Sequence, residues 1–130
     1  MEINSELITV YIPTYNRVEL LKRAVNSVLS QSYQNFELII VDDCSPDETI
    51  KYLEKLSASD SRILFFKNVK NSGACVSRNK AIAEAKGRYI TGLDDDDEFT
   101  PDRLEFLLKN FKENYSFVCS SLIIIDSKKS

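Results

Sequence analysis

The sequence predicts an α/β domain in which a mostly parallel sheet carries helices on both faces. Short apolar runs rich in β-branched residues alternate with segments whose apolar residues recur at helical spacing. Parallel strands need crossover connections, and helices placed between them cover the faces of the sheet. Of the 130 residues, 43% are hydrophobic and 28% charged, which is typical of a folded domain. We therefore expect residues 1–130 to form one domain, with a frayed tail at 126–130.

Five segments have the composition of buried strands. Each is a short, nearly continuous apolar run, as expected where helices cover both faces of a sheet. The predicted strands are 7–12, 36–41, 63–66, 88–93 and 117–125.

Helices are expected between these strands. Apolar residues at helical spacing predict a first helix at about 18–31. A second is expected to begin at Ser45, since Ser45 suits the N-cap, Pro46 the first turn and Glu48 the closing position of a capping box.

Two further helices follow the third and fourth strands. The first of them is expected at about 74–86, with Gly87 as the residue that ends it. The other follows the cap-and-proline sequence at 100–102. Its expected inward-facing residues are Leu104, Leu107, Leu108 and Phe111.

Composition excludes several classes of protein. The 17 basic and 20 acidic residues give a net charge of −3, and the acidity is concentrated at residues 94–98, so a basic face for nucleic acid is not expected. Cys44, Cys75 and Cys119 lack CxxC spacing and the chain has no histidine, which argues against a zinc site or a disulfide framework. No signal peptide or transmembrane segment is predicted. We expect a cytoplasmic protein that can also associate peripherally with the inner membrane face.

Polar segments directly follow four of the predicted strands. They are residues 13–17, 42–45, 71–78 and 94–97. The carboxyl ends of parallel strands open on one edge of a sheet, where ligands of such folds bind. We therefore expect these four segments to converge on one site.

The run of four aspartates at 94–97 is the sharpest feature. Four successive carboxylates repel one another and call for a counter-charge. Asp94 and Asp96 form a D-x-D whose hard oxygen ligands favour Mg²⁺ or Mn²⁺. The alternative is a solvated acidic turn before the helix that follows Thr100. The position directly after a hydrophobic strand favours the metal.

The other polar residues allow two interpretations each. Asp42 and Asp43 are equally well explained as acids at a helix N-terminus or as acceptors for a base N–H or ribose hydroxyl. Arg78 either pairs with Glu84 or solvent, or points to the edge and meets a base carbonyl or a phosphate.

Gly73 is expected to supply a positive-φ turn or to let the backbone approach a ligand. Tyr15 is as readily a packing residue as one that contacts a base. Because the chain has no histidine, neither Cys44 nor Cys75 has a partner for nucleophilic catalysis.

Four motifs occur in order along the chain. They are PTYNR at 13–17, VDDCSPDET at 41–49, NSGACVSRN at 71–79 and GRYITGLDDDDEFTP at 87–101. With these motifs the chain resembles the family-2 glycosyltransferases over about residues 7–111. The last two motifs are similar to those of enzymes that build bacterial surface polysaccharides, including colanic-acid-type glycosyltransferases. Four separated motifs in order are far more specific than a lone D-x-D.

The resemblance implies a GT-A fold, which is Rossmann-like, and Mn²⁺ or Mg²⁺ as cofactor. It implies a nucleoside-diphosphate-sugar donor, with the UDP type favoured, and a saccharide or lipid-linked saccharide acceptor. By analogy the acceptor hydroxyl attacks directly and inverts the anomeric centre, while the metal stabilises the departing diphosphate.

The resemblance also assigns roles to residues. Residues 13–15 match the family residues that line the base and ribose pocket. Asp43, with Asp42 beside it, matches the acid that meets a uracil-type base. Asp96 is the favoured direct metal ligand, and Asp97 supports the D-x-D. The candidates for nucleotide-sugar binding are Pro13, Thr14, Tyr15, Asp42, Asp43, Gly73, Arg78, Asp94 and Asp95, and those for the metal are Asp94 and Asp96.

The general base of the family is a carboxylate in the acceptor-binding half, well downstream of the D-x-D. It is expected beyond Ser130, and Asp126 is not assigned this role. We therefore expect the chain to be truncated before the acceptor-binding half, and to bind the donor with metal but to transfer sugar poorly.

Three other functions are alternatives for a chain with this pattern. A sugar nucleotidyltransferase would have a glycine-rich basic loop after the first strand, and residues 13–17 contain no glycine. A response-regulator receiver would place its acid pair after the first strand, whereas here the pair follows the second. The third is a binding or interaction module without transferase activity.

Overall fold

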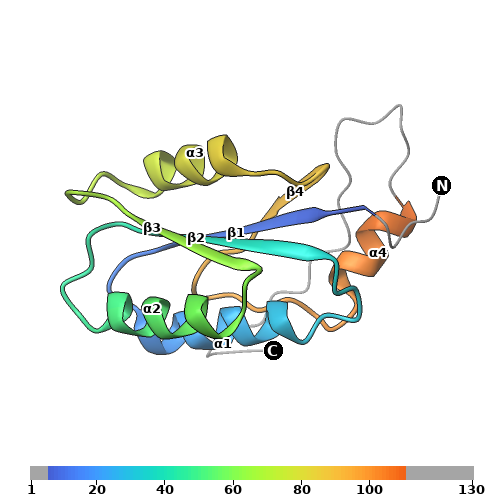
Figure 1. Ribbon diagram of the computed structural model, residues 1–130, viewed down its shortest axis with the longest axis horizontal. Helices are drawn as coiled ribbons and strands as arrows, with labels where there is room; N and C mark the ends of the chain where they lie inside the picture. The colour runs from blue at the N-terminus through green and yellow to red at the C-terminus, as the bar shows by residue number, and fades with distance from the viewer. Residues whose placement is uncertain (1–5, 111–130) are drawn as a thin grey trace, which may run out of the picture.

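The computed structural model of the chain describes residues 6–110. Its elements, in order, are β1 (Ile8–Thr14), α1 (Val18–Leu29), β2 (Phe36–Asp42), α2 (Thr49–Ser59), β3 (Ile63–Lys67), α3 (Ala74–Glu84), β4 (Tyr89–Gly92) and α4 (Arg103–Asn110) (Figure 1). The alternation of strands and helices predicted for this part of the chain is therefore confirmed. Phe111, the predicted strand at 117–125 and the tail at 126–130 lie outside the described residues.

The four strands form one parallel sheet in the order β3-β2-β1-β4. From β1 the chain moves outward through β2 to β3, and then returns past β1 to add β4 on the other side. The direction of winding therefore reverses between β1 and β4. In open α/β sheets the ligand crevice lies at the carboxyl ends of the strands beside such a reversal.

Helices cover both faces of the sheet, as predicted. In Figure 1, α1 and α2 lie on one side of the strands and α3 on the other. Strand side chains alternate between the faces, so that Val10 and Ile40 join the large core under α1 and α2, whereas Ile39 and Val41 pack with Ala81 of α3. The amphipathic α1 buries four side chains without measurable exposure, Leu21, Ala24, Val25 and Val28.

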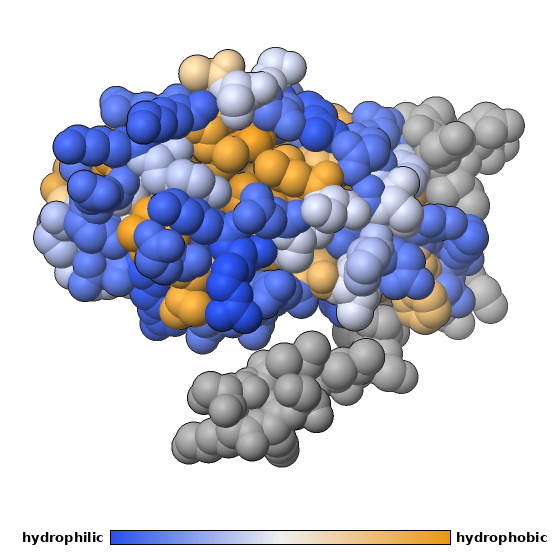
Figure 2. Space-filling model, turned by 90° about the horizontal axis from the view of Figure 1, so that it is seen from below, coloured by the Kyte–Doolittle hydropathy of each residue, from blue (hydrophilic) through white to orange (hydrophobic). Residues whose placement is uncertain are grey.

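The two faces are covered to different extents. Helix α3 contacts β1 and β2, and the outer strands keep Leu64 and Ile90 exposed at 39% and 44%. Figure 2 views the molecule from the side of α1 and α2, where hydrophobic residues show as a patch framed by hydrophilic ones. None of the helices in residues 6–110 has the length and apolar character needed to cross a bilayer.

Gly87 does not end α3 as a left-handed residue, so that prediction was wrong. The helix ends at Glu84, and the next residue, Ala85, is already extended with φ −68° and ψ 137°. Gly87 instead lies against β1, where its N–H donates to Thr9 Oγ1 at 2.8 Å. A Cβ at this position would lie 2.5 Å from the backbone nitrogen of Thr9. Close approach of two backbones therefore explains this glycine.

We expect Gly87→Ala to lower the free energy of unfolding by about 1–3 kcal/mol, because the added methyl group overpacks against backbone that cannot move aside. Gly92→Ala is the matched comparison, since a Cβ there would meet the far end of the Tyr11 ring at 2.6 Å. That ring can turn away, so the loss should be smaller. Urea unfolding of both variants measures the difference, and an equal or larger loss in Gly92→Ala would contradict the explanation.

Helix α2 begins at Thr49, so the capping box predicted at Ser45 was also wrong. Asp42 is fully buried, and its carboxylate accepts the Ser45 N–H at 3.0 Å and the Ser45 hydroxyl. Ser45 is thereby held at the end of β2. Asp47 takes its place at the start of the helix, where its Oδ1 accepts the Thr49 N–H at 3.0 Å.

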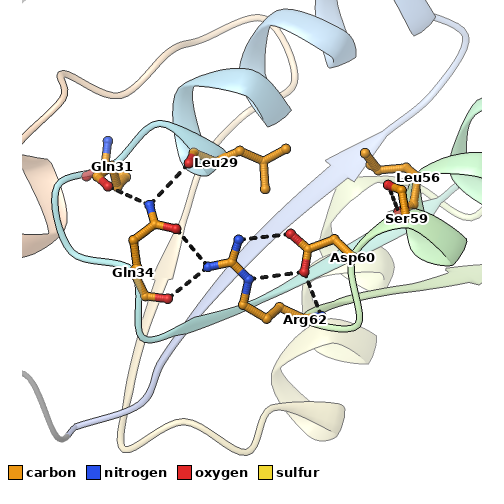
Figure 3. A network of polar contacts seen from close by, with 7 residues as sticks. All are labelled: Leu29, Gln31, Gln34, Leu56, Ser59, Asp60 and Arg62. Carbon is orange, nitrogen blue, oxygen red and sulfur yellow. Dashed lines mark hydrogen bonds and ion pairs between the residues drawn. The ribbon is translucent and has the colours of Figure 1, made fainter.

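Arg62 joins the turns that lead into β2 and β3, at the amino edge of the sheet (Figure 3). Its guanidinium pairs with Asp60 at 2.8 Å and donates to the Gln34 carbonyl at 2.9 Å. It also stacks on the Phe36 ring, 4.3 Å from the ring centroid. Hydrogen bonding from Arg62 is the main reason that the pKa of Asp60 is lowered. This cluster stabilises the sheet at the edge opposite the four polar loops.

Candidate functional site

A cavity of about 480 Å³ lies at the carboxyl edge of the sheet, beside the β1–β4 pair at which the winding reverses. The loops after β1, β2 and β4 meet there with the first turns of α3. Its lining residues are Pro13, Thr14, Tyr15, Asn16, Arg17, Asp43, Ala74, Ser77, Arg78, Asp94, Asp95 and Asp96. The structure thus brings together every predicted site residue except Asp42 and Gly73.

Three carboxylates of the aspartate run form a cluster. Asp94, Asp96 and Asp97 are exposed, and each offers an oxygen within 4.8 Å of the others. A turn, closed by the Asp97 N–H on the Asp94 carbonyl at 3.1 Å, places them side by side. The pKa of Asp97 is raised by burial and by the charges of the neighbouring aspartates. A cluster of hard oxygen ligands with excess negative charge fits Mg²⁺ or Mn²⁺.

Asp95 differs from its three neighbours because it is buried. It is only 6% exposed, and its carboxylate accepts the Thr14 hydroxyl at 2.9 Å and Arg17 Nη1 at 3.2 Å. Burial raises its pKa, although the hydrogen bond from Thr14 and the charge of Arg17 act the other way. Asp95 therefore ties the loop after β4 to the end of β1. The sequence predicted a contact with the nucleotide sugar, and in the structure both oxygens serve protein donors.

Arg17 is a site residue that the sequence analysis did not single out. Its Nη1 lies 3.2 Å from Asp95 Oδ1 and 3.4 Å from Asp96 Oδ2. The available signal was its place in the PTYNR loop directly after β1. Asn16 was missed as well, and it precedes Arg17 with a left-handed φ of 55°.

Asp43 holds the loop that leads into α3. It is 5% exposed and accepts hydrogen bonds from Asn68 Nδ2 at 2.8 Å, the Ser72 N–H at 2.7 Å and the Gly73 N–H at 2.8 Å. Burial alone would raise its pKa, but the three hydrogen bonds outweigh burial and lower it. Oδ2 accepts only the Gly73 N–H from the described residues, so it can accept one more donor.

The two predicted residues that do not line the cavity have other roles. Asp42 is fully buried on Ser45, behind the cavity wall. Gly73 has a φ of 96°, as predicted for a positive-φ turn, and its N–H is used by Asp43. Both residues shape the loops that carry the site.

Arg78 and Tyr15 both face the cavity. Arg78 Nη2 lies 3.7 Å from Asp94 Oδ1, so the predicted alternative of pairing with Glu84 is wrong. Tyr15 is 41% exposed, which argues against a packing role. Ala74 and Ser77 share the cavity-facing side of α3 with Arg78, at the helical spacings of three and four residues.

The sequence matches that of known proteins over most of its length. Residues 9–130 match the family described as Glycosyl transferase family 2. The chain is 52% identical over 107 residues to the putative colanic acid biosynthesis glycosyl transferase WcaA of Escherichia coli, covering 81% of this chain and 38% of WcaA. It is 42% identical over 123 residues to the putative teichuronic acid biosynthesis glycosyltransferase TuaG of Bacillus subtilis, covering 92% and 49%. The chain thus spans less than half the length of either relative.

The fold matches solved structures as well. Residues 1–349 of S. aureus TarS in complex with UDP superpose with a TM-score of 0.70 at 30% identity, covering 76% of this chain and 30% of that chain. The mannosyltransferase PcManGT of Pyrobaculum calidifontis, in complex with GDP-Man and Mn²⁺, has a TM-score of 0.67 at 24% identity, covering 74% and 29%. The second likeness shows the shared fold alone. Sequence and structure together show that the chain belongs to glycosyltransferase family 2 and has the GT-A fold.

Proposed function

We propose that this chain binds a nucleoside-diphosphate sugar of the UDP type together with a divalent cation, as the donor side of a sugar transfer. The observation that carries the proposal is one cavity in which the carboxylates of Asp94 and Asp96 face Tyr15, Asp43 and Arg78. TarS, 30% identical to this chain, has been solved with UDP and with UDP-GlcNAc, which supports the choice of nucleotide.

The nucleotide is recognised by the loops on either side of the cavity. The half-exposed ring of Tyr15 offers a flat surface for the base, beside Pro13 and Thr14. Asp43 has one acceptor position left for a base N–H or a ribose hydroxyl. Arg78 is the donor for a base carbonyl or a phosphate oxygen.

The proposed cation is Mn²⁺ or Mg²⁺, and Asp94 and Asp96 are its direct ligands. Asp97 lies in the same cluster and supports them. Two protein carboxylates are sufficient when a diphosphate supplies further oxygens. The bound cation supplies charge stabilisation to the departing diphosphate. The hydrogen bond from Thr14 to Asp95 anchors the aspartate turn to the end of β1. We infer that this contact keeps the carboxylates of Asp94 and Asp96 at the cavity.

The reaction we infer is inverting transfer of the sugar to a hydroxyl of a saccharide or lipid-linked saccharide, in the cytoplasm, during synthesis of a bacterial surface polysaccharide. The names of WcaA and TuaG, which refer to colanic acid and teichuronic acid, support this class of product. The general base expected beyond Ser130 stays a prediction, because it falls outside the described residues.

Calorimetric titration of the chain with UDP, GDP and ADP, each with and without Mn²⁺, tests the proposal. We expect UDP to bind in the presence of Mn²⁺, and to bind at least about tenfold more weakly without it, since a diphosphate beside the exposed carboxylates of Asp94, Asp96 and Asp97 is then repelled at a cost of well over about 1 kcal/mol. GDP and ADP should bind more weakly than UDP. Binding of Mn²⁺ that is indifferent to all three nucleotides would contradict the proposal and favour a receiver-like protein.

A further inference from the structure

Arg17 occupies an unusual position among the aspartates. Both of its ion pairs use the same nitrogen, Nη1, which lies 3.2 Å from Asp95 and 3.4 Å from Asp96. Within residues 6–110, neither Nη2 nor Nε of Arg17 has a protein partner, and half of the side chain is exposed on the cavity wall. The guanidinium therefore pairs with two carboxylates through one nitrogen and leaves its other N–H groups available to a ligand in the cavity that Arg17 lines.

The backbone aims Arg17 at this position. Asn16 takes the left-handed conformation, and its N–H donates to Ser45 Oγ at 2.8 Å. Ser45 is in turn fixed by the buried carboxylate of Asp42. The loop after β2 thus braces the loop after β1, and fixes the backbone from which Arg17 reaches Asp95 and Asp96.

The position of Arg17 has opposite consequences for the two ligands. A cation bound by Asp94 and Asp96 would lie near the Arg17 guanidinium, which pairs with Asp96 at 3.4 Å, so Arg17 would repel the cation and compete for one of its ligands. A diphosphate in the same cavity is attracted by the guanidinium, whose free donors suit phosphate oxygens. Arg17 therefore disfavours the cation alone and favours the cation with its diphosphate.

We propose that Arg17 couples the two ligands, so that the site takes up the cation together with the nucleoside diphosphate and resists the cation alone. This inference rests on the proposed function. It makes Arg17 a binding residue whose charge sets the order of preference among ligands. A residue that only stabilised the aspartate turn would affect both ligands in the same direction.

The test is calorimetry on the whole chain, with Mn²⁺ alone and then with UDP in saturating Mn²⁺. Arg17→Gln should bind Mn²⁺ alone about two- to fivefold more tightly, the range expected when a half-exposed ion pair is removed. It should bind UDP in Mn²⁺ roughly tenfold more weakly, as expected for loss of a charge-assisted contact. Arg17→Lys keeps the charge and should move both affinities less.

Arg23→Gln is the matched control, because it removes the same charge from nearby α1. Arg23 pairs with Glu98 at 2.7 Å, on the surface and away from the cavity lining. Arg23→Gln should leave the affinity for Mn²⁺ alone and the affinity for UDP in Mn²⁺ unchanged. Thermal unfolding of each variant verifies that it folds.

Changes of opposite sign for the two ligands support the coupling. If Arg17→Gln binds both ligands more weakly, or binds both with unchanged affinity, the coupling is overturned even when the wild type binds UDP with Mn²⁺. Failure of the wild type to bind UDP under any condition overturns the proposed function instead.

Discussion

Asp96→Asn is expected to abolish Mn²⁺-dependent binding of UDP. Asp96 is exposed in the carboxylate cluster, and its replacement removes a charged metal ligand while Arg17 remains in place to repel the cation. Changes to groups that only orient metal ligands cost roughly 10–100-fold in metal affinity, so loss of a direct ligand should weaken Mn²⁺ binding by at least about 100-fold. Titration of Mn²⁺ followed by its electron paramagnetic resonance signal measures this directly, in the presence and absence of UDP.

Glu98→Gln is the control for Asp96→Asn. It removes the same charge two residues further along, from a side chain that pairs with Arg23 instead of joining the cluster. Its Mn²⁺ affinity should stay within about twofold of the wild type, since an exposed pair contributes little. If the Mn²⁺ affinity fell by the same factor in both variants, the general negative charge of the segment would be responsible for binding. The assignment of Asp96 as a ligand would then fail.

Asp43→Asn should both destabilise the fold and prevent nucleotide binding. The carboxylate accepts backbone N–H groups on both of its oxygens, from Ser72 and from Gly73. An amide has one oxygen, so its NH₂ group must face one of these N–H donors. Leaving a buried donor unsatisfied costs about 1–3 kcal/mol. These two hydrogen bonds are only partly buried, so we expect a loss near the lower end, about 1 kcal/mol, in urea unfolding at neutral pH. The loop should also shift, which moves Arg78 on α3.

The pH dependence gives an independent check on Asp43. Its pKa is lowered below the ordinary value of 3.8 in the folded state. The stability it contributes is therefore present above that value and is lost as the pH falls through the lowered folded pKa. The difference in unfolding free energy between wild type and Asp43→Asn should accordingly shrink on acidification from neutral pH.

Asp60→Asn is the control for Asp43→Asn, because it should lower the stability of the fold without changing UDP binding. The pKa of Asp60 is also lowered, here by Arg62, and the pair lies at the amino edge of the sheet. This variant should lose stability with a similar dependence on pH and still bind UDP in Mn²⁺ like the wild type. Unchanged UDP binding in Asp43→Asn would show that Asp43 has no part in shaping the site.

The arrangement of the sheet was predictable because it depends on patterns that are local in the sequence. Apolar runs marked the strands, periodicity marked the helices, and their alternation required a parallel sheet with its polar loops on one edge. Eight of the ten predicted site residues, all but Asp42 and Gly73, line the cavity for this reason.

What the sequence did not reveal depends on contacts between distant segments. Nothing in four identical neighbours indicates that Asp95 turns inward to Thr14 while Asp94, Asp96 and Asp97 stay exposed. The start of α2 was misplaced because Ser45 serves the buried Asp42 instead of a helix end, and burial of Asp42 follows only from the assembled fold.

The cavity wall also indicates where its chemistry could be redesigned. The loops after β1 and β2 have little freedom to vary, since Asn16 and Cys44 adopt left-handed backbone that most other residues resist. Ala74 is different, because it is the first residue of α3, is exposed, lines the cavity and has no side-chain hydrogen bond to lose. Libraries randomised at Ala74 would change the width of the pocket while leaving the scaffold intact, and so offer the simplest route to engineered donor preference.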